Sequence, residues 1–470
     1  MLLPALFAAL VAATPPPVDE RSVVALIMVD RFSDGAVNAA DVVVGHPRRF
    51  QGGDLAGVRA RLPYLKALGV SHLWLTPLHD QIDHLVGEGD TATAGYHGYW
   101  PERFRAVDPH FGTIEELRTL VDEAAANDMG VIIDVVVNHF GYGAKQTRSL
   151  VRPSCGDDDE TRCLFGLPDL QTELPRVRSV VVDNTRWWLR QAPFVGVRLD
   201  AFKHIDRQTA LAITRMAHRQ RAGTMVIAER WGAEPGSADV VADVKAGAAD
   251  AAFDFGLMGL ARDFVVGRLR PKALAHHLEQ RAQALSSGPP MLTFLDNHDV
   301  ETWAHAAGEH APLGAALLLG TPGIPAITWG SEVGRVGGAV DPDNRTMIDW
   351  ARVDDPLPKA TRAWWSSLIA LRRSSAALQR GAFTILAADD AAGAIAFART
   401  DGSERVVVVI AGATPFEHAV VLGATEAVVD GSRWPAAPLP AVETIGDARR
   451  FVARVPAHGA VVVRLRTPLR

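Results

Sequence analysis

The sequence predicts an α/β protein built on a (β/α)8 TIM-type barrel, with a lobe inserted after the third strand and an antiparallel β-domain at the C-terminal end. Eight short, apolar, β-rich runs alternate with amphipathic helical stretches between residues 23 and 329, a pattern typical of parallel strands joined by crossover helices. From Gly381 onward short alternating runs replace the helical pattern. A doubly wound open sheet is the alternative, but no Gly-rich phosphate-binding loop follows the first run to support it.

The predicted barrel elements follow one another in a regular order. The eight strands are expected at residues 23–29, 72–76, 131–137, 194–201, 224–228, 251–255, 291–295 and 324–329. The helices between them are expected at residues 55–68, 114–127, 177–191, 207–221, 271–285 and 313–319. Eight strand–helix units over this length favour a closed barrel.

Two departures from a plain barrel divide the chain into domains. Residues 139–173 are polar and rich in Gly and Asp, and this stretch is too long for an ordinary loop between a strand and a helix, so we expect a small lobe over the site. The barrel is then predicted at 18–138 and 174–378, and the β-domain at 379–470. Within the β-domain we expect strands at 383–386, 394–398, 405–410, 419–422 and 460–465.

The charge and composition narrow the class of partner. A net charge of −6 without a long basic run argues against nucleic acid or an anionic membrane surface, and we expect neither as a partner. A neutral small molecule or polymer fits better. Several of the 11 tryptophans fall in loops beside polar motifs, which suits the flat apolar faces of sugars, although core packing explains most of them.

The N-terminal end resembles a secretion signal. Residues 1–13 are nearly all apolar and precede Thr14 and three prolines, so we predict a signal peptide and linker over residues 1–17 and export to the periplasm or the medium. The apolar stretch is too short to span a membrane. Cys155 and Cys163 are the two cysteines. In an exported protein they favour a short disulfide, whereas in the cytosol they would be free thiols.

Ionisable residues gather where four of the predicted strands end. In a (β/α)8 barrel the chemistry is built at the carboxyl ends of the strands. The residues concerned are Asp134, Asn138 and His139 on the third strand; Arg198, Asp200, Lys203 and His204 on or just after the fourth; Glu229 after the fifth; and His298 and Asp299 after the seventh.

Three of these carboxylates suit the cleavage of a glycosidic bond. This reaction needs a nucleophile, a proton donor and negative charge near an oxocarbenium-like centre, for which we predict Asp200, Glu229 and Asp299 respectively. The strand period of two places Arg198 on the same face as Asp200, where it keeps the nucleophile ionised. The neighbours of Glu229 are expected to raise its pKa, as an acid catalyst requires. Each carboxylate taken alone is explained by a structural ion pair or a helix cap. Three carboxylates at neighbouring strand ends are not explained in that way.

Four motifs carry a resemblance to a known family. IIDVVVNH, GVRLDAFKH, IAERW and FLDNHD occur on successive predicted strands, and in this order they resemble the α-amylase family of retaining glycoside hydrolases, from Asp30 to about Trp350. The resemblance implies the same catalytic roles for Asp200, Glu229 and Asp299.

The resemblance also implies a set of substrate contacts around those carboxylates. Hydrogen bonds to the reacting sugar, an aromatic platform beneath it, an arginine beside the nucleophile and a pair that grips the neighbouring glucose are expected. These contacts are assigned to His97, Tyr99, His139, Arg198, Lys203, His204, His298, Asp341 and Arg345.

Calcium is the cofactor that the resemblance implies. It would tie the lobe to the barrel through Asn138, Asp169, the backbone carbonyl of His204 and a fourth ligand from the acidic loop, Glu160 or Asp159. The alternative interpretation of that acidic loop is an ordinary solvated surface.

Together these observations predict a secreted, monomeric, calcium-dependent α-amylase that hydrolyses α-1,4 bonds inside starch, glycogen or maltooligosaccharides. A cyclomaltodextrinase or neopullulanase activity, or glucanotransfer by the same site, is the close alternative. A non-catalytic glucan-binding protein on the same barrel is a more distant one. Trp231, Trp303 and Trp329 stand where the local sequence departs from the commoner family pattern, which predicts reshaped outer subsites.

Overall fold

The computed structural model describes residues 14–36, 39–145, 149–445 and 448–468. The predicted signal sequence at residues 1–13 lies outside the described residues. None of the described helices is both long enough and apolar enough to cross a membrane.

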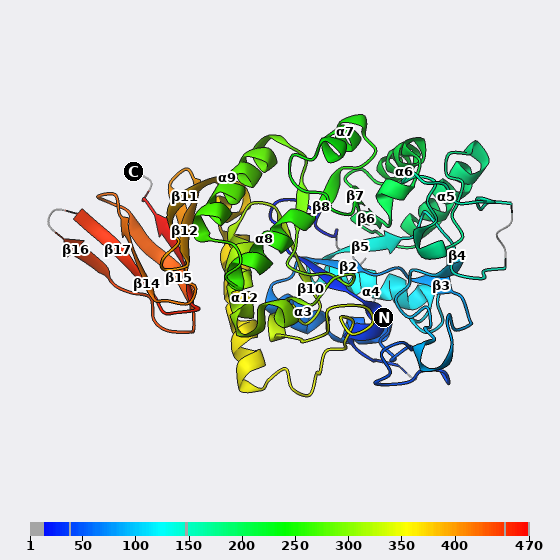
Figure 1. Cartoon of the computed structure of the whole chain (residues 1–470), viewed down its shortest axis with the longest axis horizontal. Coiled ribbons are helices and arrows are strands. Elements are labelled where there is room, and N and C mark those ends of the chain that lie inside the picture. Colours follow the sequence, from blue (N-terminus) through cyan, green and yellow to red (C-terminus); the bar gives the residue numbers. More distant parts are fainter. Residues whose placement is uncertain (1–13, 37–38, 146–148, 446–447, 469–470) are drawn as a thin grey trace, which may run out of the picture.

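Eight parallel strands close into a barrel, as the sequence predicts (Figure 1). Around the barrel the strands pair in the order β1, β10, β9, β8, β7, β6, β5 and β2. Nearly all their side chains are buried, which explains their continuous apolar runs. Their bounds are Val24–Ile27 (β1), His72–Leu75 (β2), Gly130–Val135 (β5), Gly196–Leu199 (β6), Met225–Ala228 (β7), Ala251–Asp254 (β8), Met291–Thr293 (β9) and Ile324–Thr328 (β10).

Helices surround the barrel. The predicted helix at 55–68 is broken at Arg61, because Pro63 lacks the N–H that a continuous helix would need at that position. The longer helices are α2 (Leu55–Ala60), α3 (Leu62–Leu68), α4 (Ile114–Ala126), α5 (Pro175–Leu189), α6 (Arg207–Gln220), α7 (Ala238–Ala246), α8 (Phe255–Val265), α9 (Pro271–Ser287), α11 (Ala311–Gly320) and α12 (Pro356–Ser374). Shorter ones are α1 (Val29–Phe32), α10 (Trp303–Ala307) and α13 (Ala376–Arg380).

The segment between β5 and α5 is irregular. A short 3-10 turn, Leu164–Gly166, lies beside the disulfide between Cys155 and Cys163 that the sequence favoured. Isolated bridges, including one between His139 and Asp169, fix this lobe to the end of β5. A two-stranded antiparallel sheet, β3 (His79–Gln81) with β4 (Pro101–Val107), lies in the preceding connection.

Two antiparallel sheets form the C-terminal domain, at one end of the molecule beside α9 and α12 (Figure 1). The larger sheet has the order β11, β12, β13, β18 and β15, and the smaller sheet has the order β14, β17 and β16. Their bounds are Ala382–Asp389 (β11), Ala394–Asp401 (β12), Glu404–Ile410 (β13), Phe416–Val421 (β14), Ala427–Trp434 (β15), Val442–Ile445 (β16), Ala448–Val455 (β17) and Ala460–Arg466 (β18).

The three central strands of the larger sheet, β12, β13 and β18, are buried on both faces. Phe397 and Val408 belong to the core that continues from the barrel, whereas Ala396 and Val407 belong to a second core between the two sheets. The strand period of two sends alternate residues to these two cores. The domain therefore packs on the barrel through a continuous apolar face.

Candidate active site

One guanidinium connects the acidic residues at the ends of β5, β6 and β7. Arg198 is 1% exposed, and its Nη1 lies 2.9 Å from Asp134 Oδ1 and 2.8 Å from Asp200 Oδ1. Its Nη2 lies 3.8 Å from Glu229 Oε2. The parallel pairing of β5 with β6 sets Asp134 beside Arg198 in register. The side chains of Arg198 and Asp200 therefore meet as the strand period predicts.

The chain turns sharply just after Asp200. Ala201 has a φ of +50°, a left-handed conformation that is unfavourable for a residue with a Cβ. Its amide N–H donates a hydrogen bond of 3.0 Å to Glu229 Oε2. The turn therefore couples the position of Glu229 to that of Asp200.

Glu229 is held in its protonated form near neutral pH. Burial raises its pKa, the nearby Arg198 opposes this effect, and the charges of Asp200 and Asp299 raise the pKa further, to about 8. A carboxyl group that retains its proton at pH 7 is able to act as a general acid. The sequence predicted this direction of the shift.

Asp299 is held in the opposite state. Burial by itself would raise its pKa, but His298, Arg345 and Arg198 together keep the pKa below its ordinary value. Asp299 Oδ2 lies 3.1 Å from His298 Nε2, and its Oδ1 lies 3.2 Å from Arg345 Nη2. Near pH 7 the site thus contains one protonated and one ionised carboxyl group, the division of roles that acid catalysis requires.

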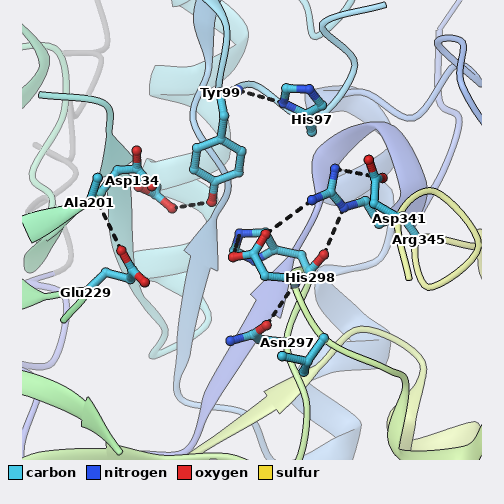
Figure 2. A network of polar contacts seen from close by, with 12 residues as sticks. His97, Tyr99, Asp134, Ala201, Glu229, Asn297, His298, Asp341 and Arg345 are labelled. Atoms are coloured by element: carbon cyan, nitrogen blue, oxygen red, sulfur yellow. Dashed lines mark hydrogen bonds and ion pairs between the residues drawn. The ribbon is translucent and has the colours of Figure 1, made fainter. Parts of the chain in front are cut away.

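Aromatic rings line the space between these groups, as Figure 2 shows. The ring of Tyr99 stacks on His298 with a centroid distance of 5.1 Å, and it stacks on His97 at 5.9 Å. The hydroxyl of Tyr99 donates to Asp134 Oδ2 at 2.8 Å. The position and orientation of the Tyr99 ring are therefore fixed from several directions.

Two histidines have ring nitrogens available for a ligand. His139 and His298 are 4% and 1% exposed. Among the described residues, neither His139 Nδ1 nor His298 Nδ1 has a hydrogen-bond partner. Burial lowers the pKa of His139, so its ring is neutral near pH 7. Buried polar groups are rarely left unpaired, so each of these nitrogens is expected to bond to a water molecule or to a bound ligand.

Arg345 connects three residues at the other end of the site. Besides Asp299, its guanidinium contacts Asp341 Oδ1 at 3.0 Å and the backbone carbonyl of His298 at 2.8 Å. Tyr96, which the sequence analysis did not single out, donates its hydroxyl to the same Asp341 oxygen at 2.9 Å. Asp341 and Arg345, which were predicted to bind the neighbouring glucose, therefore lie in direct contact.

Lys203 and His204 face the lobe. Lys203 Nζ lies 3.7 Å from Asp159 Oδ1, and His204 Nδ1 lies 2.6 Å from the carbonyl oxygen of Asp159. These contacts tie the segment after β6 to the acidic loop. The substrate contacts expected for the two residues stay a prediction.

Asp134 is a functional residue to which the sequence analysis gave no role. It accepts hydrogen bonds from Arg198, Tyr99 and Trp74, the last from Nε1 at 3.2 Å. Burial raises its pKa to about 6, although Arg198 opposes the shift. The sequence feature that could have identified Asp134 is its position as a charged residue inside the otherwise apolar run of β5.

Two of the three tryptophans expected to reshape the outer subsites do not reach the surface. Trp303 and Trp329 are only 1% and 2% exposed, so that expectation is wrong for both. Each donates its indole N–H to a backbone carbonyl and packs in the core. Trp231 is 49% exposed beside Glu229 in the chain and is available to a ligand.

The predicted calcium ligands present unpaired polar atoms. Within the described part of the chain, Asn138 Oδ1, Asn138 Nδ2 and Asp169 Oδ1 are buried without hydrogen-bond partners. The described residues contain no group of three or more His, Cys, Asp or Glu that suits a metal ion. A cation here would therefore need amide and carbonyl oxygens as well, which suits calcium. Arg152, which was not anticipated, donates from Nε to Asp169 Oδ2 at 3.0 Å.

The barrel and its paired carboxyl groups define an enzyme of the glycoside hydrolase class. Residues 26–161 and 161–370 match the family model described as alpha amylase, catalytic domain. The chain belongs to the α-amylase family, as the four motifs indicated.

Characterised relatives with several different activities are similar to the chain. It is 26% identical over 473 residues to a cyclomaltodextrin glucanotransferase of Klebsiella oxytoca, which covers 83% of this chain and 70% of the relative. It is 28% identical over 445 residues to neopullulanase 2 of Thermoactinomyces vulgaris, which covers 84% and 70%. An α-amylase of Streptomyces lividans is 27% identical over 528 residues, covering 88% and 56%.

Solved structures of α-amylases have the same fold. The acarbose complex of the α-amylase from Geobacillus thermoleovorans superimposes with a TM-score of 0.80 at 28% identity, covering 96% of this chain and 99% of the other. An α-amylase from Anoxybacillus gives a TM-score of 0.82 at 28% identity with the same coverage.

Proposed function

We propose that this enzyme is an endo-acting α-amylase that hydrolyses α-1,4-glucosidic bonds in starch, glycogen or maltooligosaccharides with retention of configuration. The observation that carries the proposal is the pair formed by Asp200, ion-paired to Arg198, and Glu229, whose pKa is raised to about 8. The names of several relatives and structural neighbours, α-amylases among them, support the substrate class.

The two carboxyl groups divide the reaction between them. Asp200 attacks the anomeric carbon while Glu229 gives its proton to the leaving oxygen, so that a glycosyl ester forms on Asp200 and a shortened glucan leaves. Glu229, now ionised, then takes a proton from water as the water attacks the ester and releases Asp200. Ionised Asp299 stabilises the positive charge that develops on the sugar.

Hydrolysis of cyclomaltodextrins or pullulan, or transfer of the glycosyl group to another sugar, is the second candidate function. Relatives named cyclomaltodextrin glucanotransferase, neopullulanase and cyclomaltodextrinase favour it as well as the α-amylases favour the first. The chemistry up to the glycosyl ester is the same, and only the acceptor or the shape of the glucan differs.

A product profile separates the two functions. The purified protein is incubated with soluble starch, a cyclodextrin and pullulan in turn, and the sugars are resolved by chromatography over time. Rapid loss of starch viscosity with short α-anomeric products supports the α-amylase. Preferential cleavage of the cyclodextrin or of pullulan, or the appearance of longer chains, supports the second function. The Asp200→Asn variant serves as the inactive control.

We also propose that calcium occupies the site at Asn138 and Asp169 and that the protein is exported. The unpaired buried oxygens of those two side chains support the metal, which when bound would supply structural cross-linking between lobe and barrel. The disulfide between Cys155 and Cys163 supports an oxidising compartment.

A further inference from the structure

A cavity of about 290 Å³ lies on the flank of the barrel, where α3 packs beside α12 (Figure 1). Residues of α3 line one side, and Trp350, the segment after it and α12 line the other. None of the residues assigned to the active site belongs to this lining. Small-molecule sites begin at about 300 Å³. The cavity is therefore separate from the catalytic groups, and its volume suits a small ligand.

Two aromatic rings in the lining pack against each other. The rings of Tyr64 and Trp350 meet edge to face, with a centroid distance of 5.0 Å. The hydroxyl of Tyr64 donates to Glu332 Oε1 at 2.6 Å, and the indole N–H of Trp350 donates to the carbonyl of Phe32 at 2.6 Å. The polar atoms of both rings are thus already bonded to the protein. The pair therefore offers the cavity a fixed apolar surface, which lowers the entropic cost of binding.

Arg61 adds a cation that has no counterion. Its guanidinium lies 3.8 Å from the ring centroid of Trp350, a cation–π contact that holds it in place. Its Nε donates to Ser33 Oγ at 3.3 Å. Within the described part of the chain, the two terminal nitrogens of Arg61 have no hydrogen-bond or ion-pair partner. Their N–H groups are therefore available to an acceptor, in the planar fork that matches an oxyanion.

The side of the cavity formed by α12 adds a neutralised arginine and a hydroxyl group. Arg362 donates from Nη2 to Asp354 Oδ1 at 2.6 Å and from Nη1 to the carbonyl of Val353 at 3.2 Å. Ser366 follows Arg362 by one helical turn, on the same face of α12, and its hydroxyl has no partner among the described residues. Because Asp354 compensates Arg362, the lining keeps the single positive charge of Arg61.

A phosphate group meets the requirements of this lining. A phosphate ester carries about 1.5 to 2 negative charges near pH 7 and three strong acceptor oxygens. Two of these oxygens suit the fork of Arg61, and the third suits the hydroxyl of Ser366. The aromatic pair offers apolar surface to the carbon part of an ester. A neutral ligand would leave the charge of Arg61 without a partner.

We propose that this cavity binds a phosphate group, as the free ion or as the monoester of a small sugar, with Arg61 and Ser366 as the donors. The site is independent of the proposed function, because its lining shares no residue with the catalytic groups.

Isothermal titration calorimetry of the purified protein tests the proposal. Inorganic phosphate and glucose 6-phosphate are titrated in turn, at constant ionic strength and without added calcium. We expect saturable binding at one site per chain. Arg61→Gln should raise Kd at least about tenfold, the loss of about one charge-assisted hydrogen bond, and Ser366→Ala should raise it about threefold. Tighter binding of the ester identifies a sugar phosphate as the ligand, and equal or weaker binding identifies the free ion.

Arg59→Gln is the matched control. It removes the same charge two residues earlier, but Arg59 lies outside the lining and pairs with Glu123 at 3.1 Å. This variant should keep the wild-type Kd, and melting temperatures verify that all three variants fold. Absence of saturable binding to the wild type, or a Kd that Arg61→Gln leaves unchanged, overturns the site. Displacement of glucose 6-phosphate by maltotriose would place the ester among the catalytic groups and would also overturn it.

Discussion

Asp200 and Glu229 lie beside the same guanidinium but contact it differently. The guanidinium of Arg198 contacts Asp200 directly at 2.8 Å, whereas its distance to Glu229 is 3.8 Å. The closer contact is a direct ion pair that orients Asp200, whereas burial raises the pKa of Glu229 to about 8 and leaves it protonated near pH 7.

The first prediction concerns Asp200. Asp200→Asn removes the nucleophile while keeping the shape of the side chain, and we expect kcat on starch to fall by about four to six orders of magnitude. The rate of reducing-sugar release from starch measures kcat. Asp122→Asn, an exposed change on α4, should leave kcat unchanged. Near-normal turnover by Asp200→Asn would contradict the assignment.

The second prediction concerns the pH dependence of Glu229. Its pKa is raised from the ordinary 4.5 to about 8, so the protonated acid is present below pH 8 and is lost as the pH rises through that value. We expect kcat/KM on maltooligosaccharides to hold at neutral pH and to decline above about pH 8. A decline that begins near pH 5 would show that the acid has an ordinary pKa.

α-Maltosyl fluoride provides the control for this pH profile. Fluoride leaves without a proton, so its hydrolysis does not need the protonated form of Glu229 in the first step. The alkaline decline in the rate of glycosyl-ester formation should therefore disappear with this substrate. Its persistence would assign the decline to another group.

At the scale of elements, the lobe after β5 has little regular structure of its own and depends on a few contacts with the barrel. Arg152 pairs with Asp169 at 3.0 Å and with Glu173 at 2.9 Å, and the disulfide closes the acidic loop. The unpaired atoms of Asn138 lie where β5 meets this lobe. These ion pairs and the cross-link add to the apolar contacts that Phe140 and Leu170 of the lobe make with the barrel core.

The third prediction tests the calcium proposal at this lobe. A ligand that binds only the folded protein stabilises it, by about 2.7 kcal/mol at a concentration one hundred times its Kd. We expect a chelator to lower the melting temperature and added calcium to restore it. Asn138→Ala should abolish the response, whereas Asp157→Asn in the acidic loop should keep it. A melting temperature that changes with neither chelator nor added calcium would contradict the calcium proposal.

At the scale of the whole molecule, the C-terminal domain and the barrel share one core. A Cβ placed on Gly320, the last residue of α11, would come within 3.1 Å of the Phe397 ring and 3.0 Å of Val408. The absence of a side chain at Gly320 therefore lets the larger sheet approach the barrel closely. The domain covers apolar surface of the barrel, so the two parts are expected to unfold together.

The fourth prediction concerns this contact. Phe397 is fully buried between the two parts, and Phe397→Ala should lower the free energy of unfolding by about 3–5 kcal/mol while keeping a single transition. Unfolding in denaturant, monitored by tryptophan fluorescence, measures the free energy of unfolding. Val421→Ala, at a position 58% exposed, is the control and should have little effect. Two separate transitions in the wild type would contradict a shared core.

Much of the site was predictable because its signals are local in sequence. The apolar runs specify the barrel strands, and the motif around Asp200 places the arginine and the carboxylate on one face. The C-terminal strand β17 was missed because three arginines interrupt its apolar pattern, and its pairing with β14 and β16 decides its structure. The break at Arg61 was missed because the apolar period continues past Pro63.

The sequence by itself determined the barrel and the family and predicted the three catalytic carboxyl groups, since period and motif are properties of neighbouring residues. The tertiary structure decided what depends on residues far apart in the chain. It buried Trp303 and Trp329, brought Arg152 to Asp169, and made Arg31 a link between the carbonyls of Pro47 and Arg345. Desolvation and long-range contacts arise only when the chain folds, and these effects set the protonation of Glu229.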